Sequence, residues 1–191
     1  MAGDPRQVTY HTHFASKYKK YLDGKFVDFI LNECKNIQCD IDNTTLRGSW
    51  RNNQIICDFA NNIFPEEPSF DSLATEITEH DGVFLVREKD VERYLREYKP
   101  LQLRYSKAKK LNQEYKVKNY GESKGGTYNR VLIYPTKKIT EWLFESKELD
   151  TFETKCKFYV AITRAKHSVA IVCKNNLKTD ILPFYEQYKG M

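Results

Sequence analysis

The most constraining feature of this 191-residue sequence is the stretch 158–172, FYVAITRAKHSVAIV, because its hydrophobic period changes partway along. Between residues 152 and 163, apolar or small residues recur every three or four positions, which is the spacing of one buried helix face. Residues 169–173 are then continuously apolar, which is typical of a strand covered on both faces. The stretch predicts a buried helix, a turn of two residues and a buried strand, with Arg164 at the junction.

Both ends of the predicted helix have polar signals. Asp150 and Glu153 stand three apart, like a capping box with Asp in place of Ser or Thr. Lys166 and His167 are expected to close the helix, where its dipole favours cations. Arg164 is a candidate phosphate ligand, because a planar guanidinium fixed at a helix end can pair with phosphate oxygens. The alternative is a surface arginine at a helix terminus.

Short strands and helices alternate along much of the chain. Apolar runs at 82–86, 101–105 and 131–134 predict strands, the pattern at 91–98 predicts a helix, and the charged run 107–110 is expected to be a solvated helix face. Such alternation predicts an α/β fold with a mostly parallel sheet, in which loops at the carboxyl ends of the strands hold the functional residues.

The segment 159–166, Tyr-Val-Ala-Ile-Thr-Arg-Ala-Lys, resembles motif VI of the UvrD/Rep-like superfamily 1 helicases. In that family the arginine of the Thr-Arg-Ala core is the arginine finger on the γ-phosphate of ATP. The resemblance implies this role for Arg164, and it implies that the fold is the second, C-terminal RecA-like domain, a three-layer P-loop NTPase-like domain without its own P-loop.

Residues 3–7, Gly-Asp-Pro-Arg-Gln, resemble motif III of the same helicases. There the glutamine senses the γ-phosphate and links it to the DNA site, which implies that role for Gln7. Tyr10 matches the family's tyrosine and is expected at the nucleic acid, whereas the family's base-stacking tryptophan would fall at Thr12. The alternative for this segment is a polar terminus with a turn at its Asp-Pro step.

Residues 44–61 resemble motif IV, with a short strand, a turn and a helix that Asn52 or Asn53 can cap. Where the family has Tyr-Arg, this chain has Trp50 and Arg51. The resemblance implies that the tryptophan stacks on adenine, for which its large π face suits it, and that the arginine is a second cation on the γ-phosphate. The alternative for Trp50 is an ordinary core or surface tryptophan.

A strand–loop–strand pattern resembles motif V, since Ser123, Lys124 and Gly125 match the family's Ser-Lys-Gly. Glycines let the backbone approach a sugar or a phosphate closely. The family usually continues with a glutamate that touches the ribose of ATP, whereas here Gly126 and Thr127 follow, so a hydroxyl replaces the carboxylate. The resemblance places Ser123 and Lys124 toward nucleic acid and the next three residues toward ATP. The alternative for Lys124 is a structural role.

The sequence contains no phosphate-binding loop of the Gly-x-x-x-x-Gly-Lys-Ser/Thr type, since all eight glycines lie outside that pattern. It also lacks the acidic pair expected to hold Mg²⁺. We therefore expect half of a motor, in which ATP is shared with a missing N-terminal RecA-like domain that holds Mg²⁺, and we expect the chain alone to be inactive. About fifty residues separate motifs IV and V, too few for an accessory subdomain.

Composition narrows the class of protein. The formal net charge of +5 is compatible with nucleic acid but does not prove it. Five cysteines without ligand spacing favour reduced thiols in a cytoplasmic protein, and the pair His11 and His13 has no accompanying ligands, so no metal site is expected. No apolar run approaches the ~20 residues that span a bilayer, so no membrane partner is expected.

The sequence predicts three regions: residues 1–38 with motif III and a helical lead-in, 39–175 as the RecA-like domain, and 176–191 as a tail. The predicted function is the C-terminal half of an ATP-dependent helicase or translocase acting on single-stranded DNA, with RNA left open. The alternative is a non-catalytic nucleic-acid-binding or interaction module from a truncated helicase. A self-sufficient ATPase is disfavoured, because the phosphate cradle is missing.

Overall fold

The computed structural model describes residues 3–9, 16–36, 40–42, 45–149 and 151–186. The α-helices are α1 (Phe26–Glu33), α2 (Gln54–Asn61), α3 (Val91–Tyr98), α4 (Lys137–Glu145) and α5 (Phe152–Ile162). The 3-10 helices are η1 (Pro5–Gln7), η2 (Ser16–Tyr21), η3 (Glu88–Asp90) and η4 (Gly121–Ser123). The strands are β1 (Gly48–Ser49), β2 (Asp71–Ser72), β3 (Gly82–Arg87), β4 (Leu101–Arg104), β5 (Val117–Asn119), β6 (Tyr128–Tyr134) and β7 (Ala165–Cys173).

Five strands form one sheet in the order β3-β7-β6-β4-β5, and every neighbouring pair is parallel. In the centre, Val169 of β7 is in register with Val83 of β3 and with Val131 of β6. The short strands β1 and β2 pair separately, also in parallel. The predicted α/β class with a mostly parallel sheet is confirmed.

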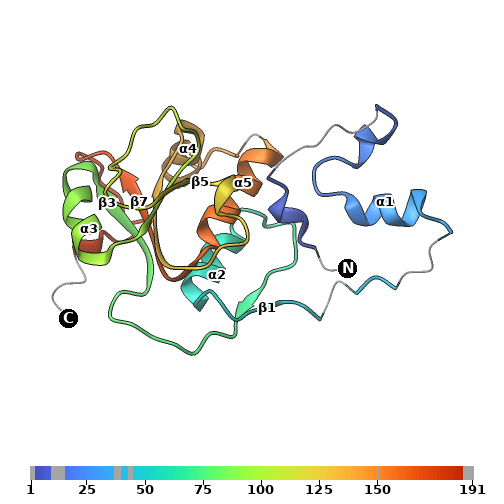
Figure 1. Cartoon of the computed structure of the whole chain (residues 1–191), viewed down its shortest axis with the longest axis horizontal. Helices are drawn as coiled ribbons and strands as arrows, with labels where there is room; N and C mark the ends of the chain where they lie inside the picture. Colours follow the sequence, from blue (N-terminus) through green and yellow to red (C-terminus); the bar gives the residue numbers. More distant parts are fainter. Residues whose placement is uncertain (1–2, 10–15, 37–39, 43–44, 150, 187–191) are drawn as a thin grey trace.

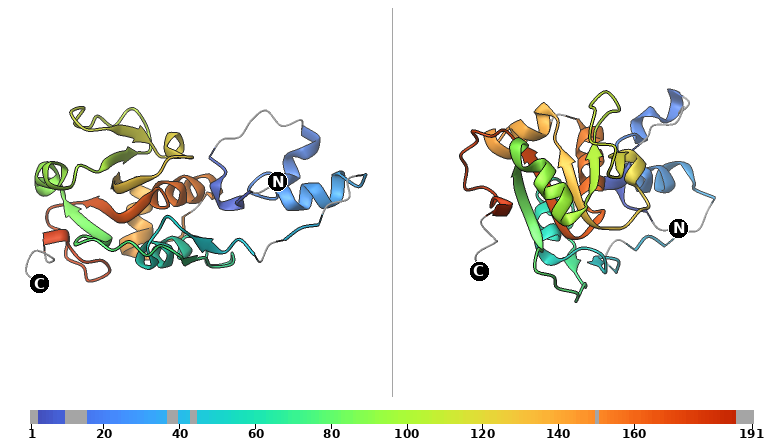
Figure 2. Two further views of the ribbon diagram at one scale, coloured as in Figure 1. Left: turned by 60° about the horizontal axis from the view of Figure 1, so that its bottom comes forward. Right: turned by 60° about the vertical axis from the view of Figure 1, so that its left-hand side comes forward.

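Helices cover both faces of the sheet (Figures 1 and 2). Because side chains alternate along a strand, Val169 and Ile171 face one apolar cluster and Ala170 and Val172 face another. The first cluster includes residues of α2, α4 and α5, whereas the second includes Tyr94 and Leu95 of α3. The continuous apolar run of β7 is thus explained by burial on two sides.

The polar residues at the two ends of α5 differ in role from the prediction. Its N-cap is Thr151, whose side chain accepts a hydrogen bond from the backbone N–H of Thr154, so the capping box starting at Asp150 was wrong. Asp150 itself lies outside the described residues. Lys166 and His167 belong to β7 and not to the helix, because Ala165 and Ser168 on either side of them already pair with β6. Strand pairing therefore overrides the preference of cations for a helix end.

The chain from 105 to 116, which joins β4 to β5, contains no helix, so the expected solvated helix face at 107–110 was wrong. Other elements begin as the sequence indicates. Asn53 caps α2 by accepting from the backbone N–H of Ile56, and Thr136 caps α4 by accepting from that of Ile139. Helix α3 covers the predicted residues 91–98.

The N-terminal segment extends away from the sheet, whereas the C-terminal tail packs against it. The segment with η2 and α1 projects to one side of the sheet (Figures 1 and 2). In contrast, the backbone N–H of Leu85 in β3 donates to Pro183 O, and Phe184 and Tyr185 are buried, so the tail covers part of the β3 edge. Within the described residues, no helix has both the length and the apolar character needed to cross a bilayer. Cys156 and Cys173 are buried free thiols, as predicted.

Candidate active site

The residues that match motifs IV, V and VI meet at the amino ends of the central strands. Arg164 directly precedes β7, Thr127 directly precedes β6, and Arg51 lies in the turn before α2. We call Arg51, Gly126, Thr127, Thr163 and Arg164 the arginine cluster. Thr127 and Arg164 lie in turns that lead into strands and Arg51 lies in a turn that leads into α2, whereas the sequence predicted functional loops after the carboxyl ends of strands.

Arg51 joins three segments that are far apart in the sequence. Its Nε donates to Thr127 Oγ1 at 2.8 Å, and its Nη1 donates to Thr163 O at 3.1 Å. These partners are 76 and 112 residues away along the chain. The guanidinium is only half-buried, so part of it stays open to solvent or to a bound anion.

Arg164 is buried, with 2% of its surface exposed, and is held by neutral groups. Its Nε donates to Val160 O at 3.1 Å, its Nη2 to Thr163 Oγ1 at 3.1 Å and its Nη1 to Gly126 O at 3.4 Å. Burial, and after it the nearby charge of Arg51, lower the pKa of Arg164 to about 10, so the group stays charged at neutral pH.

The positive charge of the arginine cluster is not paired within the part of the chain that the structure describes. Among the described residues, neither Arg51 nor Arg164 has a carboxylate within ion-pair distance. Placing a cation in a protein interior is costly unless it is paired, and such perturbed groups gather at functional sites. The arrangement therefore fits an anion supplied from outside the chain. The alternative of a surface Arg164 does not hold, because the side chain is buried.

Asn52 is a member of the site that the sequence did not single out. Its buried amide Nδ2 donates to Thr163 O at 3.2 Å and to Ala165 O at 2.7 Å, while its Oδ1 accepts from Ser49 Oγ at 2.7 Å. It thereby fixes the turn that presents Arg164. The available signal was the Asn-Asn pair before α2: only one asparagine can cap the helix, which leaves the other for a second role.

Trp50 is 77% exposed, so the core alternative for this residue is excluded and its ring is free to stack on a planar ligand. Gly125 adopts φ +83°, and a Cβ built there would meet nothing within 4 Å, so its backbone conformation and not crowding favours glycine. Gly126 contributes its carbonyl oxygen to Arg164. Both glycines therefore shape the loop beside the cluster.

The motif III and motif V segments also touch. Lys124 Nζ donates to Gln7 O at 2.7 Å, and the side chain of Gln7 donates to Asp4 Oδ2 at 3.1 Å. Ser123 is fully buried, and its hydroxyl donates to Tyr120 O at 2.6 Å. Tyr10, Thr12 and His13 lie outside the described residues, so the tyrosine predicted to contact nucleic acid has no position here.

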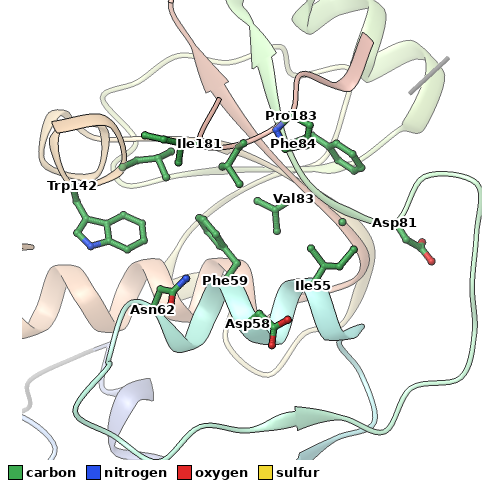
Figure 3. Close-up of a pocket in the computed structure, with 13 residues that line it drawn as sticks. Ile55, Asp58, Phe59, Asn62, Asp81, Val83, Phe84, Trp142, Ile181 and Pro183 are labelled. Atoms are coloured by element: carbon green, nitrogen blue, oxygen red, sulfur yellow. The ribbon is translucent and has the colours of Figure 1, made fainter. Parts of the chain in front are cut away.

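A pocket of about 470 Å³ lies elsewhere, between α2, β3, α4 and residues 181–183 (Figure 3). Its lining is mainly apolar, with Phe59, Val83 and Trp142 beside the acidic Asp58 and Asp81. None of the residues assigned to ATP or nucleic acid lines it. No group of three or more metal-ligating side chains occurs among the described residues.

Neither a protein-family model nor a curated protein matches the chain. Similar solved structures include the PRRSV helicase, at 20% identity and a TM-score of 0.44, over 69% of this chain and 23% of that one. The complex of arterivirus nonstructural protein 10, a helicase, with DNA has 19% identity and a TM-score of 0.42, over 67% and 25%.

The C-terminal domain of a possible DNA helicase from Lactobacillus plantarum WCFS1 has 12% identity and a TM-score of 0.44, over 72% of this chain and 99% of that one. The matched region spans about a quarter of the two viral chains described above. Because all three similarities are weak, the assignment of function depends on the arginine cluster itself.

Proposed function

We propose that this chain is the second RecA-like domain of an ATP-dependent helicase or translocase motor of the UvrD/Rep-like kind. The observation that supports this most is the arginine cluster, assembled from three motif-like segments in the order that the family uses. Its two guanidinium groups have no carboxylate partner among the residues that the structure describes. A polyanion such as the triphosphate of ATP fits that excess of positive charge.

In this proposal, Arg164 and Arg51 stabilise the charge that develops on the γ-phosphoryl group during transfer to water. Trp50 stacks on adenine, and the 125–127 loop contacts the ribose through Gly125, Gly126 and Thr127. The chain has no residues for a phosphate cradle, so a partner RecA-like domain supplies the phosphate-binding loop and the Mg²⁺ ligands. Hydrolysis then takes place between the two domains.

The contact between Lys124 and Gln7 supports the nucleic-acid part of the proposal. The contact joins the segment that resembles motif III, with its γ-phosphate sensor, to the loop that resembles motif V, with its nucleic-acid contact. A shift in one segment can therefore move the other. In the proposal Tyr10 contacts the nucleic acid beside Lys124, and the buried Ser123 holds this loop in place through its bond to Tyr120 O. Residues 1–38 form the motif III segment and lead-in, residues 39–175 the motor domain and residues 176–191 the tail. Single-stranded DNA is the proposed track, with RNA as an outcome to test.

The first test is ATP hydrolysis with and without single-stranded DNA. We expect no measurable turnover by this chain alone. We expect DNA-stimulated turnover when the chain is joined to the residues encoded directly upstream in the same reading frame, which we call the joined protein. Robust turnover by the chain alone would refute the half-motor assignment. Inactivity of both proteins would favour the non-catalytic module, for which nucleic-acid binding is the remaining measurement.

Replacing Trp50 by alanine should weaken ATP binding by the joined protein roughly 2- to 13-fold, because an aromatic pair contributes about 0.5–1.5 kcal/mol beyond burial. Unfolding temperature should not change, since the ring is mostly exposed. Trp50→Phe, which keeps a smaller ring, should fall between the two. Titration with a fluorescent ATP analogue measures the nucleotide affinity of the wild type and of the two variants. Equal affinities would show that Trp50 does not contact the base.

A further inference from the structure

The positive charge of the chain is concentrated in residues 104–118, which we call the basic loop. This segment has one acidic residue, Glu114, against six basic ones, so its formal charge of +5 equals that of the whole chain. The remainder is therefore formally neutral. The basic residues are Arg104, Lys107, Lys109, Lys110, Lys116 and Lys118.

The backbone of the basic loop is fixed although it contains no helix. The side chain of Gln102 donates to Asn112 O at 2.7 Å, and Arg104 Nη1 donates to Lys109 O at 2.7 Å. Leu111 and Tyr115 pack against the apolar cluster that includes α3. Leu111 and Tyr115 are half-buried there, so the middle of the loop is held against this face of the sheet.

The lysines of the loop are mostly exposed and have few counter-charges. Among the described residues, Lys107 alone of the six basic residues comes within ion-pair distance of a carboxylate, at 3.6 Å from Glu122. Arg104 donates to the neutral Asn119 Oδ1, and Lys109 lies over the ring of Tyr134. Several ammonium groups on one fixed backbone therefore face solvent without neutralisation.

We propose that the basic loop binds the phosphate backbone of single-stranded nucleic acid without reading its sequence. Lysine ammonium groups act as point charges on phosphates and do not impose base recognition. Tyr105, at 36% exposed, offers a partly open ring beside them for base stacking. A membrane surface is the poorer fit, because the loop's Leu111 and Tyr115 pack inward and leave little apolar surface to insert.

The position of the loop connects this surface to the proposed motor. Lys107 lies beside Glu122 in η4, and Lys124 follows η4 directly. The basic loop would therefore extend the nucleic-acid path that begins at Lys124. In that respect the inference depends on the proposed function, but binding by the loop can be measured without ATP.

The test compares two triple variants of the full chain for binding to a labelled oligothymidylate at several salt concentrations. Lys107→Gln/Lys109→Gln/Lys110→Gln removes three loop charges, and Lys137→Gln/Lys138→Gln/Lys147→Gln removes three exposed charges around α4. The logarithm of the affinity falls linearly with the logarithm of the salt concentration, and each phosphate contact to a single strand makes this slope steeper by about 0.7. We expect the slope of the loop variant to be shallower than that of the wild type by about 2, because three contacts are lost. The α4 variant should keep the wild-type slope.

Equal slopes for the two variants, or no binding by the wild-type chain at low salt, would overturn the inference. So would loss of binding to phosphatidylserine vesicles by the loop variant while oligothymidylate binding stays unchanged. Arg93→Ala removes an exposed arginine outside the loop and should bind the oligonucleotide as the wild type does. An inactive joined protein with intact loop-dependent binding would thus reject the motor but not the basic loop.

Discussion

Replacing Arg164 by alanine should lower ATP turnover of the joined protein by about a thousandfold or more while leaving ATP affinity nearly unchanged. The reason is geometric: α5 ends at Ile162, β7 begins at Ala165, and the turn between them holds the guanidinium against neutral acceptors. A cation fixed in this way needs little reorganisation when negative charge develops next to it. Its loss therefore affects the transition state more than the ground state.

Two further variants separate this explanation from a general loss of structure. Arg164→Lys keeps the charge but not the planar fork, so turnover should stay far below wild type. Arg93→Ala removes an exposed arginine of α3 and should leave turnover unchanged. Thermal unfolding shows whether the Arg164→Ala protein still folds. The substitution removes three hydrogen bonds, but the loss of stability is partly offset because a buried unpaired charge is removed as well. Wild-type turnover by a folded Arg164→Ala protein would mean that the residue is not a finger.

Hydrophobic period was enough to predict the elements that are buried or strongly amphipathic. Helix α3 and the strands β3 and β7 follow from it, because burial on one or two faces leaves a pattern in the sequence. The loop between β4 and β5 could not be predicted in this way. Its backbone is held by Gln102 and Arg104, whose side-chain contacts leave no periodic trace.

Most members of the candidate site could be predicted from the sequence, but Asn52 and the geometry of the site could not. Arg51, Thr127 and Arg164 were chosen from separate motifs, and the structure brings them together. That they meet at the amino ends of strands depends on strand order, which no local pattern encodes. The role of Asn52 was also hidden, because two adjacent asparagines have the same capping chemistry and only tertiary contacts distinguish them.

Asn52→Ala should lower the free energy of unfolding by about 2–4 kcal/mol, one of the largest effects of a single polar substitution in this chain. The alanine removes three hydrogen bonds and leaves Ala165 O without this donor and Ser49 Oγ without this acceptor. Thr163 O keeps its bond from Arg51 Nη1. Each unsatisfied buried group costs about 1–3 kcal/mol. Urea unfolding of the chain measures the loss as a lower midpoint, and an unchanged slope against urea would show that the denatured state is not altered.

Asn62→Ala is the matched control, because this asparagine ends the same helix but is exposed, so its removal should change stability by no more than about 0.5 kcal/mol. If Asn52→Ala were as mild as the control, Asn52 would not be holding the turn. If it is severe, turnover of the joined protein should also fall at temperatures where the variant stays folded. The same amide would then both stabilise the domain and position Arg164, which explains why a buried polar side chain is found between α2 and β7.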